Sequence, residues 1–327
     1  MNMEHNKKMN DIDAHHGYKA RMQDTVPYPL PALEKRGEGL AIGLALGGGA
    51  ARGLAHIVVL EVFDELGLRP AMIAGASFGA MVGAAYAAGM PAAAIREHAL
   101  SVLGHPIRAA RQLLRGGETR PRNLLNFSLS RGMMLDGAAL LDLFMPPDLP
   151  ERLEDLSIPL LISTTDFHAA EEHVITSGPL RAAVAASIAI PGLIAAPKID
   201  DRLLVDGAIS NPVPFDHLQT AGCKPVIAVE VTGHPAGLVR EERKPGQTEL
   251  ALGATQIMQL KIAELKRRLS PPELWIDPPL DAYRAYDFLK CREILERADT
   301  IRDDIKRRLT ALLEGAGRVI PLPPPTT

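Results

Sequence analysis

A serine framed by two glycines is the feature that most constrains how this chain can fold. The pentapeptide Gly75-Ala76-Ser77-Phe78-Gly79 follows a short apolar run and precedes the uncharged, small-residue segment 80–88. Gly-x-Ser-x-Gly suits a sharp turn from a strand into a helix, because glycines without a Cβ atom let the two elements approach closely. We therefore predict a nucleophile elbow at Ser77, with Gly75 and Gly79 as its packing glycines.

The segment around this serine also has the composition of a membrane span. No charged residue occurs from Ala71 to Ile95, and Gly79-x-x-x-Gly83 has the spacing of a transmembrane packing motif. However, alanine and glycine make up much of the segment, and Pro91 interrupts it. We therefore expect a helix that is buried on all sides within a soluble protein.

A second strand-loop-helix unit lies directly upstream. Residues 39–46 form a short apolar run, the glycine-rich segment 47–53 follows it, and an apolar helical stripe over 54–66 ends at Gly67. Residues 68–74 then have the character of a second strand leading into the elbow. Two successive β-loop-α units predict an α/β fold with a mostly parallel sheet and helices on both faces.

The remaining pattern divides the chain into three parts. Further core strands are expected at 158–164, 203–205 and 226–231, and we expect the sheet to end at about residue 232. Helical periodicity follows at 250–269 and 283–313. We therefore expect a flexible N-terminal lead-in over 1–38, a main domain over 39–235 and a helical C-terminal extension over 236–327.

The composition excludes several classes of protein. Of the 327 residues, 46% are hydrophobic and 23% are charged, as in ordinary soluble proteins, and a net charge of −3 argues against nucleic acid as the main partner. The two cysteines, Cys223 and Cys291, fit neither a metal-binding nor a redox spacing and indicate a reducing compartment. Because the N-terminus also lacks the apolar run of a secretory signal, we expect a cytoplasmic protein.

The glycine-rich loop is compatible with several chemistries. It lacks the Gly-Lys-Ser/Thr of a phosphate-binding loop, and no acidic residue ends the next strand to hold a ribose, as a dinucleotide site requires. An oxyanion hole built from backbone N–H groups remains. Arg52 either orients this loop and adds positive potential, or pairs with a nearby carboxylate. The predicted oxyanion-hole residues are Gly48, Gly49, Ala50, Arg52 and Gly53.

A serine hydroxyl needs a base to become a nucleophile. The stronger candidate is Asp206, because an apolar strand delivers its carboxylate to a tight turn at Gly207. His217 and His234 remain alternatives, since both follow Ser77 in the order of a Ser-Asp-His triad. Their positions, at a helix start and in a loop, are more typical of surface histidines.

Three motifs in this order resemble the patatin-like phospholipase family, in particular its bacterial branch related to the neuropathy target esterase catalytic domain. They are Gly48-Gly49-Ala50-Ala51-Arg52-Gly53, Gly75-Ala76-Ser77-Phe78-Gly79 and Asp206-Gly207-Ala208, and the similarity covers about residues 40 to 235. Ala50 is a departure, because it stands where the family usually has the third loop glycine. Further matches are His56, Thr165-Asp166-Phe167, Glu171, the segment from Ala186-Ser187-Ile188-Ala189-Ile190-Pro191 to Pro197, and Asn211-Pro212.

This resemblance implies a three-layer α/β/α fold with a mostly parallel central sheet and a helical C-terminal extension. It makes 39–235 the catalytic domain and implies that Ser77 and Asp206 form a dyad in place of a triad. The implied reaction is hydrolysis of acyl esters of lipids, either phospholipids or lysophospholipids, with no cofactor and no metal ion.

Other functions stay open at this point. A regulatory or interaction protein could use a lipase-like cleft to bind lipid, although a binding cleft has no need of a nucleophile elbow, and nucleotide binding is a third alternative. The enzyme function is compatible with homo-oligomerisation and with transient contact at a membrane surface, peripheral to the inner membrane. The basic and apolar residues of 250–269 fit a membrane-surface helix, a dimer-forming helix or a core-packing helix.

Overall fold

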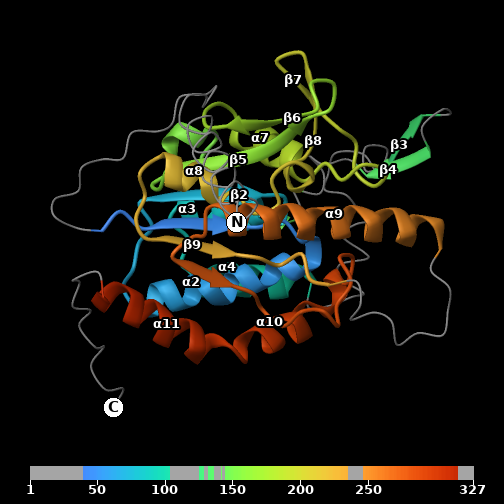
Figure 1. Ribbon diagram of the computed structural model, residues 1–327. Coiled ribbons are helices and arrows are strands. Elements are labelled where there is room, and N and C mark those ends of the chain that lie inside the picture. Colours follow the sequence, from blue (N-terminus) through green and yellow to red (C-terminus); the bar gives the residue numbers. More distant parts are fainter. Residues whose placement is uncertain are drawn as a thin grey trace, which may run out of the picture.

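A mixed, mostly parallel sheet forms the centre of the fold, with helices on both faces (Figure 1). The computed structural model describes residues 40–103, 141, 144–234 and 246–315, and the backbone alone of 125–128 and 132–135. The predicted lead-in over 1–38 lies outside these residues. The fold class expected from the two β-loop-α units is confirmed.

Five strands of the sheet run parallel, in the order β10-β9-β1-β2-β5. Both β6 and β8 pair antiparallel with β5, and β7 pairs antiparallel with β8. A separate antiparallel hairpin consists of β3 and β4. The strands are β1 (Gly43–Leu46), β2 (Met72–Ala76), β3 (Leu125–Ser128), β4 (Gly132–Leu135), β5 (Leu160–Asp166), β6 (Glu171–Ile175), β7 (Lys198–Ile199), β8 (Arg202–Asp206), β9 (Val226–Val229) and β10 (Leu274–Ile276).

The described helices alternate with the strands from β1 to α3 and dominate the last third of the chain. They are α2 (His56–Glu65), α3 (Phe78–Ala87), α4 (Ala92–Leu103), α7 (Leu180–Ser187), α8 (Phe215–Thr220), α9 (Gln247–Leu269), α10 (Cys291–Asp299) and α11 (Arg302–Gly315). Among the described residues, 3₁₀ helices add Ala50–Ala55, Leu153–Asp155, Gly207–Ile209 and Phe288–Lys290.

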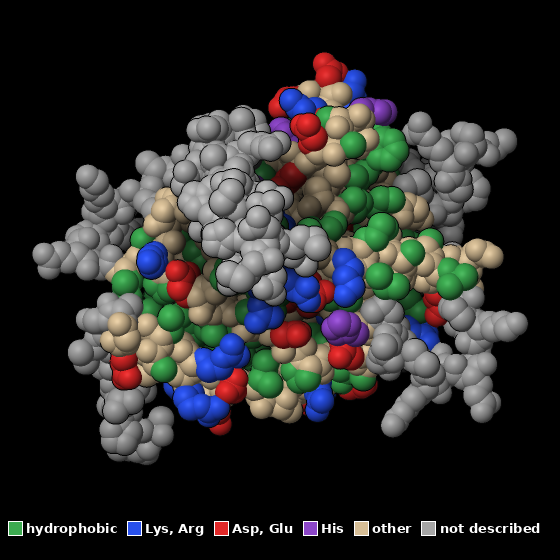
Figure 2. Space-filling model, in the orientation of Figure 1, with side chains coloured by type: hydrophobic (Ala, Val, Ile, Leu, Met, Phe, Trp, Pro, Cys, Tyr) green, Lys and Arg blue, Asp and Glu red, His purple; other side chains and the backbone are tan. Residues whose placement is uncertain are grey.

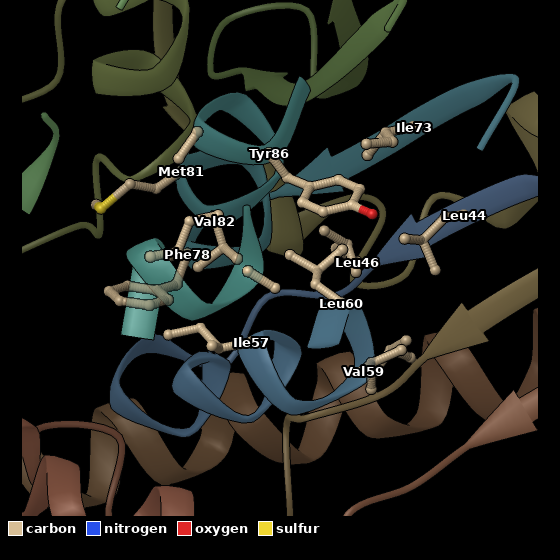
Figure 3. Close-up of a cluster of buried hydrophobic side chains, with 14 of the residues drawn as sticks. Leu44, Leu46, Ile57, Val59, Leu60, Ile73, Phe78, Met81, Val82 and Tyr86 are labelled. Carbon is tan, nitrogen blue, oxygen red and sulfur yellow. The ribbon is translucent and has the colours of Figure 1, made fainter. Parts of the chain in front are cut away.

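The sheet separates two hydrophobic cores, because successive side chains of a strand point to opposite faces. Leu44 and Leu46 of β1 belong to the larger core, which α2, α3, α4, α10 and α11 complete (Figure 3). Ala45, between them, belongs to the smaller core, together with Phe215 of α8 and Ala263 of α9. Strands with apolar side chains on both faces produce the continuous apolar runs seen in the sequence.

Helix α3 is buried along its whole length, as its small, uncharged residues predicted. Its close approach to the sheet depends on glycine, because a Cβ atom at Gly79 would lie 2.2 Å from the carbonyl oxygen of Leu46. A helix that is apolar all round belongs in a protein core or a membrane. Within the described residues, no helix is long and apolar enough to span a membrane.

One edge of β5 is shared by two strands that meet end to end. β2 runs parallel along it as far as the pair Ala76 and Ser163. β8 runs antiparallel along the next residues and ends at the pair Asp206 and Thr164, while β6 occupies the opposite edge. The carboxyl ends of β2 and β8 therefore converge, and Ser77, which follows β2, lies beside Asp206.

Some expectations about the sheet were wrong. Strands do not end near residue 232, because β10 (Leu274–Ile276) adds an outer strand beside β9. β6 and β7 were also missed, since more than half of their residues are polar and only Val174 is buried, so that they lack a buried-strand pattern. The second strand runs from Met72 to Ala76 instead of ending at Ala74, so the elbow turn begins at Ser77 itself.

Candidate active site

Ser77 occupies a strained turn between β2 and α3. Its backbone has φ 52° and ψ −126°, a conformation that residues with a side chain rarely adopt. The flanking glycines make the turn possible, because a Cβ at Gly75 would lie 2.6 Å from the Cα of Ala80, and one at Gly79 would meet Leu46. The elbow predicted from the Gly-x-Ser-x-Gly spacing is therefore present.

The hydroxyl of Ser77 donates a hydrogen bond to Oδ2 of Asp206 over 2.6 Å. Both residues are only 4% exposed. The second carboxylate oxygen, Oδ1, accepts the backbone N–H of Ala208 over 2.8 Å. Gly207 allows the tight turn after β8, because a Cβ there would lie 1.9 Å from the carbonyl oxygen of Ser163.

The carboxyl group of Asp206 is poised for proton transfer near neutral pH. Burial raises its pKa from 3.8 to about 6, and this effect outweighs the hydrogen bonds from Ser77 and Ala208, which lower the pKa. A general base works best when its pKa lies near the working pH. The geometry and the pKa of Asp206 are therefore both suited to accepting the proton of Ser77.

Ser187, the last residue of α7, holds the backbone of the elbow. Its Oγ accepts the N–H of Ser77 over 2.8 Å and donates to the carbonyl oxygen of Ser163 over 2.7 Å. The side chain is fully buried. Sequence reasoning singled out Ser187 only as part of a family motif, because nothing in the spacing indicates which backbone group it contacts.

The glycine loop offers fewer free donors than the sequence suggested. The N–H of Gly48 donates to the carbonyl oxygen of Pro212 over 2.9 Å, so its expected contribution to an oxyanion hole is wrong. The N–H of Ala51 is likewise bound to the carbonyl of Ala285. Among the described residues, Gly49 and Ala50 have no hydrogen-bond partner for their N–H groups, and both line the cavity at Ser77.

Close packing explains why the loop is rich in small residues. A Cβ at Gly48 would lie 2.5 Å from the Cβ of Ala208, and one at Gly53 would lie 2.7 Å from the ring of Phe78. Ala50 has φ 49°, a left-handed conformation that favours glycine. The departure from the family pattern at this position is therefore accommodated with backbone strain.

His56 fixes the start of the loop. Its Nε2 lies 2.8 Å from the carbonyl oxygen of Gly47, and burial lowers its pKa to about 4. The ring is therefore neutral near pH 7, and Nε2–H donates to Gly47 because a carbonyl oxygen can only accept. This hydrogen bond ties α2 to the loop that precedes it.

Arg52 lies beneath the loop as a buried cation. It is 2% exposed and lines the same cavity, and its Nη1 lies 3.5 Å from the carbonyl oxygen of Tyr283. Burial lowers its pKa to about 10, while the charges of Glu230, Asp281 and Asp287 oppose this effect. Within the described part of the chain, Arg52 forms no ion pair with a carboxylate, and the three acidic residues that affect its pKa act from a longer distance.

Neither candidate histidine contacts Ser77 or Asp206. His217 is 12% exposed, so the surface interpretation was wrong for it, and its Nε2 lies 2.8 Å from Glu172. Burial opposes its charged form, but Asp216 and Glu172 together raise the pKa of His217. The backbone N–H of His234 donates to Asp281 over 2.7 Å. The structure thus brings Ser77 to Asp206 and leaves both histidines elsewhere.

A cavity of about 570 Å³ opens beside Ser77 and Asp206. The glycine loop and the segment Ile190-Pro191 line its inner part, and α9 and Tyr286 line its outer part. Most of this lining is apolar. Within the described ranges, no group of three His, Cys, Asp or Glu side chains is arranged to hold a metal ion.

The sequence matches known proteins over the part of the chain that contains this site. The family model described as "Patatin-like phospholipase" matches residues 44–218, which is more than half of the chain. An uncharacterised NTE family protein of Mycobacterium tuberculosis is 37% identical over 217 residues, which cover 65% of this chain and 56% of the relative. Patatin-like phospholipase domain-containing protein 7 of Mus musculus is 31% identical over 287 residues, covering 79% of this chain and 20% of that protein.

The chain thus spans about half the length of the mycobacterial relative and a fifth of the mouse protein. Among solved structures, VipD from Legionella pneumophila aligns with a TM-score of 0.38 and 12% identity over 82% of this chain and 67% of VipD, a similarity too low to carry an argument. The match of the family model to more than half of the chain is decisive. The chain belongs to the patatin-like phospholipase family.

Proposed function

We propose that this protein is a serine hydrolase that cleaves acyl esters of lipids. The observation that carries the proposal is the hydrogen bond from Ser77 Oγ to Asp206 Oδ2 at the inner end of an apolar cavity. A strained nucleophile, a base with a raised pKa and free backbone donors meet there. Membership of the patatin-like phospholipase family supports the same function.

In the first half of the proposed reaction, Ser77 is acylated. Its Oγ attacks the carbonyl carbon of the ester while Asp206 Oδ2 takes the hydroxyl proton. The negative charge that develops on the carbonyl oxygen is stabilised by the N–H groups of Gly49 and Ala50, in the positive potential of Arg52. As the tetrahedral intermediate collapses, the bond to the alcohol breaks, and Asp206 returns the proton to the leaving oxygen.

In the second half, water removes the acyl group. Asp206 takes a proton from a water molecule as the water oxygen attacks the acyl carbon of the Ser77 ester. The same backbone donors stabilise the second oxyanion. Cleavage of the bond to Ser77 Oγ returns the proton to this oxygen and releases a carboxylic acid, so that the resting site is restored.

The shape and lining of the cavity support a lipid as the substrate. Its volume is in the range of sites that enclose most of a small ligand, and its apolar walls suit an acyl chain. Both cysteines are free and buried, which agrees with the cytoplasmic location that we keep as part of the proposal.

The test compares purified variants with p-nitrophenyl butyrate and a lysophospholipid as substrates. We expect Ser77→Ala and Asp206→Asn each to lose roughly 10³-fold or more of kcat/KM. His234→Ala is the matched control and should retain full activity. Unchanged turnover in either dyad variant would remove that residue from the mechanism, and loss of activity in His234→Ala but not in Asp206→Asn would favour a triad.

A further inference from the structure

The outer face of α9 presents large apolar side chains to solvent. Leu250, Ile257, Met258 and Leu265 are 51%, 50%, 57% and 58% exposed. Leu250 precedes Ile257 and Met258 by seven and eight residues, and Leu265 follows them by eight and seven, which places all four on one side of the helix. Figure 2 shows hydrophobic side chains gathered over the right-hand part of α9. An isolated exposed leucine is ordinary, but a row of four along one helix indicates a contact surface.

This apolar row continues into the candidate active site. Leu250 and Ile257 belong both to the exposed face and to the lining of the cavity that contains Ser77. Tyr286, which is 46% exposed, also lines the cavity, and its hydroxyl donates to Glu249 of α9 over 3.1 Å. Met258 and Leu265 extend the row beyond the lining. The mouth of the cavity is therefore rimmed by the same apolar side chains that α9 exposes.

The same face of α9 carries positive charge towards its C-terminal end. Lys261, between Met258 and Leu265, and Arg268, after Leu265, lie on the same side of the helix and are each 73% exposed. Both pair with Glu264, whose single carboxylate leaves the three groups with a net charge of +1. Neighbouring Arg267 adds a further exposed cation, which lies over the ring of Trp275.

We infer that this face, defined by Leu250, Ile257, Met258, Lys261, Leu265 and Arg268, docks on the surface of an anionic phospholipid bilayer. Apolar side chains flanked by Lys and Arg give reversible binding at a bilayer interface, through burial among acyl chains and attraction to anionic head groups. Docking in this way seats the mouth of the cavity on the lipid, so that an acyl ester moves into the cavity without crossing water. The inference rests on the proposed function, because the lipid supplies the substrate.

The test measures flotation of the protein with vesicles, using Ser77→Ala as the background so that no lipid is consumed. The vesicles contain phosphatidylcholine alone or with phosphatidylglycerol. Adding Met258→Glu and Leu265→Glu should lower partitioning onto the mixed vesicles by at least roughly tenfold, because two apolar contacts are lost and two negative charges are added. Phe167→Glu, at a 59% exposed residue in the turn between β5 and β6, is the matched control and should float normally.

A second pair of variants tests the charges. Lys261→Gln with Arg268→Gln should remove most of the preference for vesicles that contain phosphatidylglycerol, and should leave the weaker binding to phosphatidylcholine in place. In a background with Ser77 intact, Met258→Glu/Leu265→Glu should hydrolyse dissolved p-nitrophenyl butyrate normally but lose activity on vesicle lipid. Neither residue lines the cavity.

Several results would overturn the inference. Wild-type-like flotation of the Met258→Glu/Leu265→Glu protein excludes this face as the docking surface. A dimer in sedimentation velocity that the same variant dissociates, together with no flotation of the wild type, assigns the face to a second copy of the chain. Normal flotation without ester hydrolysis by the wild type would contradict the proposed function but support docking, so the two failures are distinguishable.

Discussion

Ser77 and Asp206 lie 129 residues apart in the sequence, yet the hydroxyl of one donates to the carboxylate of the other over 2.6 Å. The relationship follows from the edge of β5, where parallel β2 and antiparallel β8 end against neighbouring residues. Ser187 fixes the backbone of the elbow from a third element, α7. The pair is thus positioned by the sheet and requires no flexible loop.

Removing the hydroxyl of Ser187 should reduce both the activity and the stability of the protein. Ser187→Ala leaves the N–H of Ser77 and the carbonyl oxygen of Ser163 without their buried partner, which costs about 1–3 kcal/mol in stability. The strained backbone of Ser77 also loses its anchor, so we expect the kcat for p-nitrophenyl butyrate to fall about ten- to a hundredfold with little change in KM.

The matched control for Ser187 is Ser157, whose hydroxyl donates to the carbonyl oxygen of Ala87 over 2.7 Å at the far end of α3. Ser157→Ala should lower the melting temperature and leave kcat unchanged. Equal kcat losses in the two variants, or full activity in Ser187→Ala, would show that Ser187 has no positioning role.

Asp206 should destabilise the folded protein at neutral pH. Burial raises the pKa of Asp206 from 3.8 to about 6, so the folded state binds its proton more tightly than the unfolded state does. The carboxyl group of Asp206 therefore makes its full contribution to the free energy of unfolding below about pH 4, and this contribution is lost as the pH rises through 6. Asp206→Asn removes the ionisation, while its amide can still accept from Ala208 and donate to Ser77.

We accordingly expect Asp206→Asn to be more stable than the wild type at pH 7.5, by on the order of 2–3 kcal/mol. Thermal unfolding followed by circular dichroism measures this difference. The gain should almost disappear by pH 3, where Asp206 is largely protonated in both states. A gain of the same size at both pH values would contradict the raised pKa.

Replacing Ala50 by glycine should relieve strain in the loop. Ala50 has φ 49°, and a side chain in this conformation costs about 1–2 kcal/mol, part of which the greater freedom of glycine in the unfolded state offsets. Ala50→Gly should therefore raise the free energy of unfolding by up to about 1 kcal/mol. Ala51→Gly, at a buried neighbour with negative φ, should lower it by about as much. Denaturant titration distinguishes the two, and destabilisation by Ala50→Gly would argue against the strain.

Two glycine-to-alanine changes should act in opposite directions. A Cβ at Gly79 would lie 2.2 Å from the backbone oxygen of Leu46, so Gly79→Ala should displace α3 from the sheet and destabilise by several kcal/mol, on the order of 3 or more. Gly253 of α9 has no atom within 4 Å of such a Cβ, so Gly253→Ala should stabilise by about 0.5–1 kcal/mol. Melting temperatures provide the comparison, and equal effects would contradict the packing described for α3.

The sequence was sufficient to predict the two β-loop-α units and the nucleophile elbow. Local signals carry both: apolar runs indicate buried strands, and glycines around Ser77 indicate a tight turn. Asp206 was chosen as the stronger candidate base from its apolar strand and glycine turn, but that it pairs with Ser77 without a histidine was implied only by the family resemblance, since pairing along β5 is a long-range property. β10 escaped detection because it has three residues, Leu274–Ile276, with no alternating pattern.

Some features of the site could not be predicted for a different reason. The N–H of Gly48 is used by Pro212, and Ser187 accepts from Ser77, because of backbone positions that only the folded chain defines. His217 belongs to a buried cluster with Glu172, Asp216 and Lys266, where charges from β6, α8 and α9 compensate one another. Sequence patterns report burial and turns, but they do not report which polar groups become partners.

The central claim is that Asp206 activates Ser77, and the most direct test is the rate at which a fluorophosphonate labels Ser77 between pH 5 and pH 8. In the wild type, we expect this rate to rise about tenfold per pH unit below an apparent pKa near 6 and then to level off, as Asp206 becomes the free base. In Asp206→Asn, labelling should be slow and independent of pH. A wild-type rate that does not change with pH, or rapid labelling of Asp206→Asn, would contradict the claim.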